Sequence, residues 1–208
     1  MNLPPQPAPP IRPFFRALLY IAVAVGVVLV SNILAYQMGL AGLIAIRNQR
    51  ITFYFLVNPV LLLVSWLMLA GIDRRNFRTL GLWFYGGWTR EALCGIGFGA
   101  GLIAAVAGVM LATRCLAYQG FNLSAAPTGF LRIAGFLLLA AAYEEILFRG
   151  YAFQRLVDAL GALGAVALSS TLFGLAHLAN PSATVLSTAN TILAGVVLDA
   201  NHAEQPAG

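Results

Sequence analysis

The chain has 208 residues, of which 60% are hydrophobic and only 9% are charged. Soluble domains carry about 25% charged residues, because charged side chains cover the surface that faces water. This composition excludes a soluble enzyme, a disordered chain and a secreted disulfide scaffold. It predicts an all-α fold, a polytopic transmembrane helical bundle.

The formal net charge is +5, which raises the question of a nucleic-acid partner. All twelve basic residues are arginines scattered between apolar runs, and they form no basic stripe that would follow a phosphate backbone. We therefore expect the lipid bilayer, and no nucleic acid, as a partner. The Arg-only, Ala-rich composition is typical of a GC-rich bacterial gene, and we expect a multi-pass integral protein of the bacterial inner membrane.

The N-terminal part of the sequence predicts an irregular arm and two helices. Residues 1–13 contain six prolines, which resist helix formation, and form a Pro-rich N-terminal arm. Two transmembrane helices are expected within residues 14–74, with spans at 17–46 and 51–71. Asn58-Pro59 predicts a kink in the second span.

Four further apolar runs bring the predicted number of spans to about six. Most of the runs approach the roughly 20 residues that a helix needs to cross about 30 Å of hydrocarbon. The additional spans are expected at 92–111, 129–156, 163–178 and 182–198. A short polar tail, 199–208, is expected after them.

The arginines predict an orientation. Loops on the cytoplasmic side of a membrane protein carry an excess of Lys and Arg. Eight arginines fall on the side of the N-terminus and four on the other side, so the N-terminus is expected in the cytoplasm.

Two adjacent carboxylates, Glu144 and Glu145, lie well inside the predicted fourth span. A charged residue at the centre of a span costs about 2.5–3.5 kcal/mol, and ionisable groups at this depth are functional candidates. Glu145 and Arg149 are spaced i, i+4 and can pair along one helix face. Glu144 points about 100° away and has no such local partner, which suits a general base.

His177 is expected at the same membrane depth as Glu144. If the chain turns between residues 156 and 163, these side chains lie about 18 and 21 Å from the turn at a 1.5 Å rise per residue. Phe173 shares the helix face of His177, again with i, i+4 spacing. A carboxylate and an imidazole at one level can hold and activate a water, which outlines a proteolytic site.

Other interpretations of these residues remain open. The same polar cluster could be a structural network between helices or part of a proton or ion pathway. Zinc hydrolases need about three protein ligands and a water. The helix that carries Glu144 has no histidine, and the second histidine of the chain is His202 in the predicted tail. We therefore expect no metal and no other cofactor.

Glu144-Glu145-x-x-x-Arg149 followed by Phe173-x-x-x-His177 resembles the first two motifs of the CPBP intramembrane proteases. This family includes type II CAAX-processing endopeptidases and bacteriocin-processing or self-immunity proteins. The resemblance covers roughly residues 75–198, which are expected to form a CPBP-like protease core.

The resemblance implies a glutamate-dependent, metal-independent intramembrane endopeptidase that cleaves a membrane-associated peptide or protein. By carry-over, Glu144 activates a water that His177 helps to hold, and Arg149 pairs with Glu145. Phe173 shapes the cavity wall, and Asn190 either lines the pocket or packs between helices. The alternative is a non-catalytic membrane protein, in self-immunity or as a scaffold, that uses the same cluster for binding.

The sequence departs from the family pattern at its end. Family members continue with a further helix that bears His-x-x-x-Asn or His-x-x-x-Asp. Here the sequence becomes polar after Leu198, and Pro206 stands four residues after His202. A truncated or frame-shifted sequence is the preferred explanation. The protease core is thus expected to be incomplete, and whether this chain is active is left open.

Overall fold

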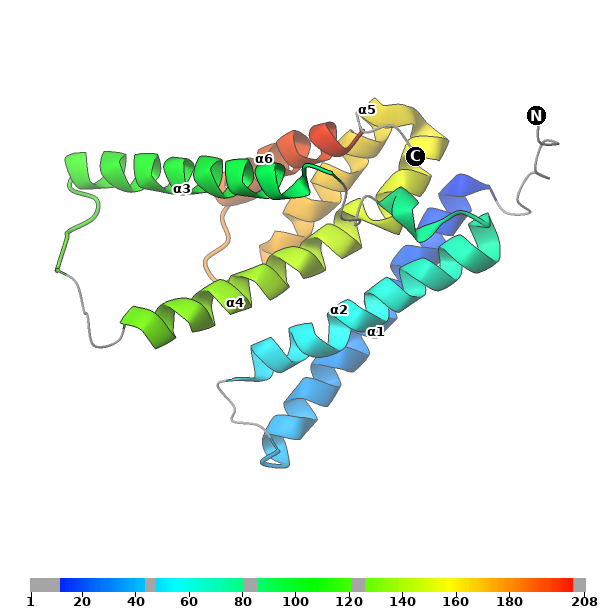
Figure 1. The fold of residues 1–208 in the computed structure, drawn as a ribbon, viewed down its shortest axis with the longest axis horizontal. Coiled ribbons are helices and arrows are strands. Elements are labelled where there is room, and N and C mark those ends of the chain that lie inside the picture. Colours follow the sequence, from blue (N-terminus) through cyan, green and yellow to red (C-terminus); the bar gives the residue numbers. More distant parts are fainter. Residues whose placement is uncertain (1–11, 44–47, 81–85, 121–125, 204–208) are drawn as a thin grey trace. The chain divides into compact units, whose positions relative to one another are not determined.

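The computed structural model describes residues 12–43, 48–80, 86–120 and 126–203, with the side chains of 126–128 and 201–203 outside the description. Every regular element within these ranges is helical (Figure 1), which confirms the predicted all-α fold. Residues 1–11 of the predicted Pro-rich arm and residues 204–208 of the predicted polar tail lie outside the described residues.

Within the described residues, the structure has six α-helices and four short helical segments. The α-helices are α1 (Pro13–Leu40), α2 (Gln49–Met68), α3 (Trp88–Ala112), α4 (Ala126–Glu144), α5 (Tyr151–Ala176) and α6 (Val185–Ala203). The π-helical segments are η2 (Leu69–Asp73) and η4 (Glu145–Arg149), and the 3₁₀ segments are η3 (Phe77–Leu80) and η5 (His177–Ala179). α2 runs through Pro59 as one helix.

Four segments of the described chain are long and apolar enough to cross a membrane, and α6 contributes a shorter apolar helix. The fourth segment, Gly129–Ala179, has 51 residues and contains two of the predicted spans. A helix needs only about 20 residues to cross the hydrocarbon, so this segment is long enough for two crossings. The total of about six spans stays a prediction.

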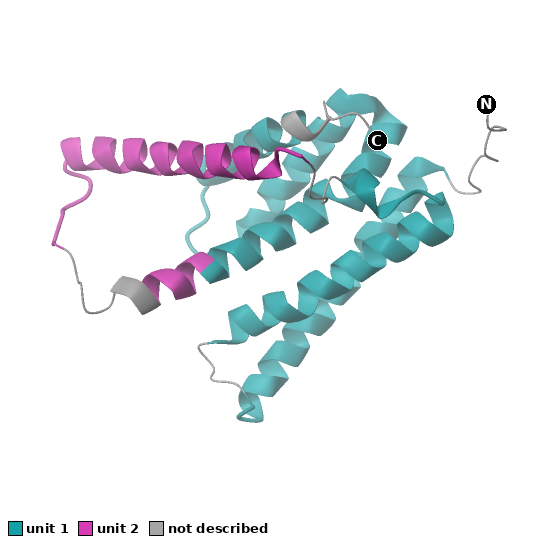
Figure 2. Ribbon diagram, viewed as in Figure 1, with its two compact units in different colours: residues 1–81, 135–208 teal, residues 82–134 magenta. Residues whose placement is uncertain are grey.

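The chain divides into two compact units (Figure 2), which are residues 1–81 with 135–208 and residues 82–134. The second unit contains α3 and the beginning of α4. The first contains α1, α2, the rest of α4, α5 and α6. All of the candidate site residues belong to the first unit, so the site can be described within that unit alone.

The core of the first unit is built by α1, α2 and α5. Tyr20, Leu61 and Tyr151 are fully buried, and the rings of Tyr20 and Tyr151 lie 5.2 Å apart. The hydroxyl of Tyr20 is hydrogen-bonded to Ser65 Oγ at 3.0 Å. These contacts join the N-terminal helices to the helix that leads to His177.

A buried charge cluster closes one end of this core. Asp73 pairs with Arg16 of α1 and, at 3.1 Å, with Arg155 of α5. Arg155 also lies 3.1 Å from Asp158. Buried charges are tolerated when they are paired, and removing one partner of such a pair costs roughly 3–5 kcal/mol. The cluster therefore fixes α5 against α1 and the end of η2.

The helical course of α5 is broken at Gly161. Its φ of 72° and ψ of 171° lie in a region that only glycine adopts readily. Gly161 falls inside the predicted turn between residues 156 and 163, about midway between Glu144 and His177 along the chain. This break allows the second half of α5 to return toward the end of α4.

The position of α6, the last helix, is fixed by its close packing against α5. A side chain at Gly195 would bring its Cβ to 3.0 Å from the backbone Cα of Ser170, a tight contact that the helices could relieve only by moving apart by a few tenths of an ångström. Gly174 of α5 likewise faces Ile192 of α6. The two glycines let the helices approach closely, as small residues do between membrane helices.

Candidate active site

The structure brings Glu144 and His177 together. Glu144 is the last residue of α4, and His177 begins η5 after the return of α5. The distance from Glu144 Oε1 to His177 Nε2 is 3.9 Å, and both side chains are partly exposed. This distance is too long for a direct hydrogen bond and leaves room for one water in contact with both groups.

The ring of His177 is oriented by its own helix. Its Nδ1 lies 2.7 Å from the backbone carbonyl oxygen of Phe173. Because a carbonyl oxygen only accepts, Nδ1 carries the proton and donates it. In the neutral imidazole, Nε2 then presents its lone pair toward Glu144. Two acceptors thus face each other, and a single water can donate one hydrogen to each.

Phe173 packs against the imidazole ring of His177. The ring is buried, its centroid lies 4.5 Å from that of His177, and it meets Phe148 edge-on at 5.2 Å. The guanidinium of Arg149 lies over the same ring at 5.4 Å. Phe173 therefore connects the His177 ring to the arginine of the first motif.

Arg149 is the centre of a buried ion-pair network. Its Nη1 donates to Glu145 Oε2 at 3.0 Å, the predicted i, i+4 pair. Its Nε donates to Asp199 Oδ1 at 2.9 Å. The Glu145–Arg149 segment is π-helical, an irregularity that is frequent at functional sites. Glu145 thus forms an ion pair with Arg149, while Glu144 faces His177.

Asp199 is a site residue that the sequence did not reveal. A polar tail is predicted from residue 199, whereas α6 continues to Ala203 and Asp199 is fully buried. It accepts hydrogen bonds from Arg149 and, at 3.0 Å, from Ser170 Oγ. These buried interactions with Arg149 and Ser170 stabilise Asp199 within the helix. In the sequence, Asp199 follows Gly195 by four residues, which puts both on one helix face. This spacing is the pattern that could have predicted the burial of Asp199.

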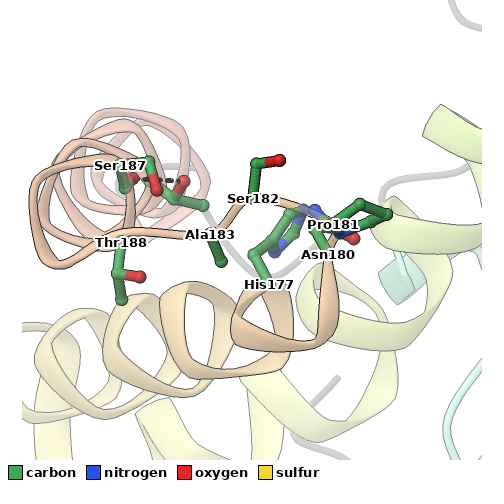
Figure 3. A pocket seen from close by; sticks show the side chains of 8 residues that line it. His177, Asn180, Pro181, Ser182, Ala183, Ser187 and Thr188 are labelled. Atoms are coloured by element: carbon green, nitrogen blue, oxygen red, sulfur yellow. Dashed lines mark hydrogen bonds between the residues drawn. The ribbon is translucent and has the colours of Figure 1, made fainter.

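A small cavity of about 210 Å³ adjoins His177 (Figure 3). α6 lines it with the hydroxyl-bearing residues Ser187, Thr188 and Thr191. Asn190 is exposed on α6 and is not among the lining residues, so the structure does not bring it to the site. The amide in this cavity belongs to Asn180, which directly follows η5.

A larger cavity of about 540 Å³ shares Asn180 and Pro181 with the first. Its walls come from α1, α2, Phe136 of α4 and the residues that follow His177. Asn180 was also missed by the sequence interpretation. Its signal is an Asn-Pro pair at the end of the His177 helix, where proline stops a helix and leaves the preceding amide at the helix end.

No three His, Cys, Asp or Glu side chains gather into a possible metal site within the described ranges.

A family model described as type II CAAX prenyl endopeptidase Rce1-like matches residues 126–201. No curated protein and no solved structure matches the chain. The matched segment contains both motifs on which the resemblance rests, and it extends over Asp199. The resemblance is thereby confirmed: residues 126–201 carry an Rce1-like domain of the type II CAAX prenyl endopeptidase family.

Proposed function

We propose that this chain is an intramembrane endopeptidase that uses Glu144 to cleave a membrane-associated, CAAX-type peptide or protein. The observation that carries the proposal is the 3.9 Å approach of Glu144 to His177 within the Rce1-like segment. The apolar helices make it an integral membrane protein, and we place it in the bacterial inner membrane.

The reaction begins with a water held between the two side chains. The water donates one hydrogen to Glu144 and the other to His177 Nε2, so that its oxygen lone pairs remain free. As the oxygen attacks the carbonyl carbon of the peptide bond, Glu144 takes one proton. The C–N bond then breaks, and Glu144 returns that proton to the leaving nitrogen. Atoms and charge balance without a covalent enzyme intermediate.

The other motif residues act by holding this pair in place. Arg149 links Glu145 to Asp199 and covers Phe173, whose carbonyl accepts from His177. Each of these contacts limits the freedom of α4, α5 or α6 next to the reacting groups. Arg149 is therefore a positioning residue, and its loss is expected to disturb both activity and folding.

The proposal is tested with the purified full chain in lipid nanodiscs and a prenylated peptide that ends in a CAAX sequence. Glu144→Gln is expected to lower product formation by at least about 100-fold, since a general base contributes roughly 10²–10⁴ in rate. Glu91→Gln, a charge change in α3 outside the site, serves as the matched control. Product masses and thermal unfolding are measured together.

The outcomes separate a protease from a binding protein. Loss of cleavage with unchanged unfolding supports the proposal. Unchanged cleavage in Glu144→Gln overturns it. If the wild type binds the peptide without cleaving it, and Glu144→Gln combined with His177→Gln weakens this binding, a non-catalytic self-immunity or scaffold role that uses the same cluster is the better account. The internally paired Arg149 network favours that second candidate, because it stabilises helices without any reaction.

A further inference from the structure

Thr188 lies on the face of α6 that packs against α5. Two contacts between these helices give their register: Gly174 with Ile192 and Ser170 with Gly195. Thr188 precedes Ile192 by four residues and therefore shares its helix face. Because the helices run antiparallel across these contacts, one turn before Ile192 corresponds to about one turn after Gly174, which is the level of His177. Thr188 and His177 accordingly line the same small cavity (Figure 3).

The hydroxyl of Thr188 lacks the hydrogen bond that the other threonines of α5 and α6 make. Thr171 and Thr191 each donate to the backbone carbonyl four residues earlier, at 2.7 and 2.9 Å. Thr188 Oγ1 is buried and has no hydrogen-bond partner among the described residues. Leaving a buried hydroxyl unpaired costs free energy, and such groups are rare in native proteins. This hydroxyl therefore calls for an explanation.

The start of α6 explains why this hydroxyl is left over. Thr184 and Ser187 cap the helix reciprocally, because each side-chain oxygen accepts from the backbone amide of the other residue, at 3.1 and 2.8 Å. The backbone carbonyl of Thr184 accepts from the Ser187 hydroxyl and from the Thr188 amide, both at 2.9 Å. A carbonyl oxygen has two lone pairs, and both are used here. The Thr188 hydroxyl thus loses its usual local acceptor and is free to contact a ligand in the cavity.

We propose that Thr188 is a further catalytic residue, whose hydroxyl donates a hydrogen bond to the oxygen of the attacked peptide carbonyl. This inference rests on the proposed function and deepens it. When the water between Glu144 and His177 adds to the carbonyl carbon, the π electrons of the C=O bond move onto its oxygen, which becomes negatively charged. Thr188 stands in the first turn of α6, where the helix dipole also favours negative charge. The hydroxyl keeps its proton, so the proton transfers of Glu144 are unchanged.

The test compares kcat and KM for the prenylated CAAX peptide, with the full chain in lipid nanodiscs. Thr188→Val removes the hydroxyl at nearly constant volume. It is expected to lower kcat about 100-fold, since the loss of one oxyanion donor typically costs 10²–10³ in rate, while KM changes little. Thr188→Ser keeps a hydroxyl and should retain most of the activity. Thr171→Val removes a hydroxyl that is paired within its own helix, and this matched control should cleave like the wild type.

Thermal unfolding separates catalysis from a structural role. Thr188→Val removes a buried polar group that has no partner among the described residues, so its unfolding temperature is expected to equal or exceed that of the wild type. A lower unfolding temperature with a parallel loss of activity would show that the hydroxyl stabilises the bundle, and would overturn the inference.

A peptide analogue with a phosphinate in place of the scissile amide gives a second measurement. Its charged oxygen stands where the oxyanion forms, so Thr188→Val should bind the analogue about 100-fold more weakly than the wild type does. Equal binding of the analogue, or a higher KM with kcat kept, would exclude the contact. Failure here is distinct from failure of the proposed function. Cleavage that needs Glu144 but not Thr188 contradicts this inference alone, whereas a wild type without cleavage contradicts the protease itself.

Discussion

Glu144 and Glu145 show how neighbouring residues of one type acquire different environments. Successive residues on a helix point about 100° apart. Glu145 therefore meets Arg149 on its own segment at 3.0 Å, whereas Glu144 meets His177 from η5. The paired carboxylate stabilises the bundle. The other faces a cavity-lining imidazole and is the one available for a reaction.

Asp199→Ala is expected to destabilise the protein strongly. The change removes one of the two carboxylates that pair with the buried Arg149, and removing one partner of a buried ion pair costs roughly 3–5 kcal/mol. Thermal unfolding in detergent measures the loss. Ser170→Ala removes only the neutral donor to the same carboxylate and should cost about 1 kcal/mol. Equal stability of Asp199→Ala and wild type would show that this ion pair contributes nothing.

Asn180→Ala is expected to slow cleavage without unfolding the protein. The side chain lines both cavities at the end of η5, where it can donate to the oxyanion that forms on the attacked carbonyl. Removing one such donor typically lowers kcat by about 10²–10³, and KM should change little. Asn190→Ala, an exposed amide outside the cavity, is the matched control. Loss of activity in the control alone would contradict this assignment.

At the scale of elements, the site depends on how closely α6 approaches α5. Gly195 allows contact with the Ser170 backbone, and the next turn of α6 carries Asp199 to Arg149. Helix packing and charge pairing are therefore coupled. A change that moves α6 outward also separates the ion pair, even though neither charged residue is altered.

Gly195→Val tests this coupling. The added side chain meets the backbone of α5 and cannot be accommodated by a rotamer change, and overpacking of this kind costs roughly 1–3 kcal/mol. We expect a lower unfolding temperature and reduced cleavage. In Gly26→Val the new Cβ has no neighbour within 4 Å, so stability and activity should stay near wild type. The coupling is refuted if the two variants behave alike.

The elements and the main site pair were predictable because they follow from local patterns. Apolar runs identify the helices, and the spacing around a turn predicts that Glu144 and His177 lie at one level. The position of Asp199 was not predictable from local polarity, because its burial depends on partners 50 and 29 residues away. The Arg16–Asp73–Arg155 cluster was unpredictable for the same reason, because its members come from three distant segments of the chain.

At the scale of the whole molecule, the buried ion pairs change the charge balance that sets orientation. Arg16, Arg149 and Arg155 are buried and paired, so they do not act as loop charges. Arg74, Arg75 and Arg78 remain together in one short connection after α2. Their concentration still predicts that this connection, and with it the N-terminus, lies in the cytoplasm.

The two cysteines of the chain report the orientation directly. Cys94 lies near the start of α3 and Cys115 follows its end, and both are exposed. A membrane-impermeant maleimide added to spheroplasts is expected to label Cys94→Ser, which keeps Cys115, and to spare Cys115→Ser. The reverse pattern would place the N-terminus outside. Lysed membranes, in which both faces are open, provide the control for reactivity.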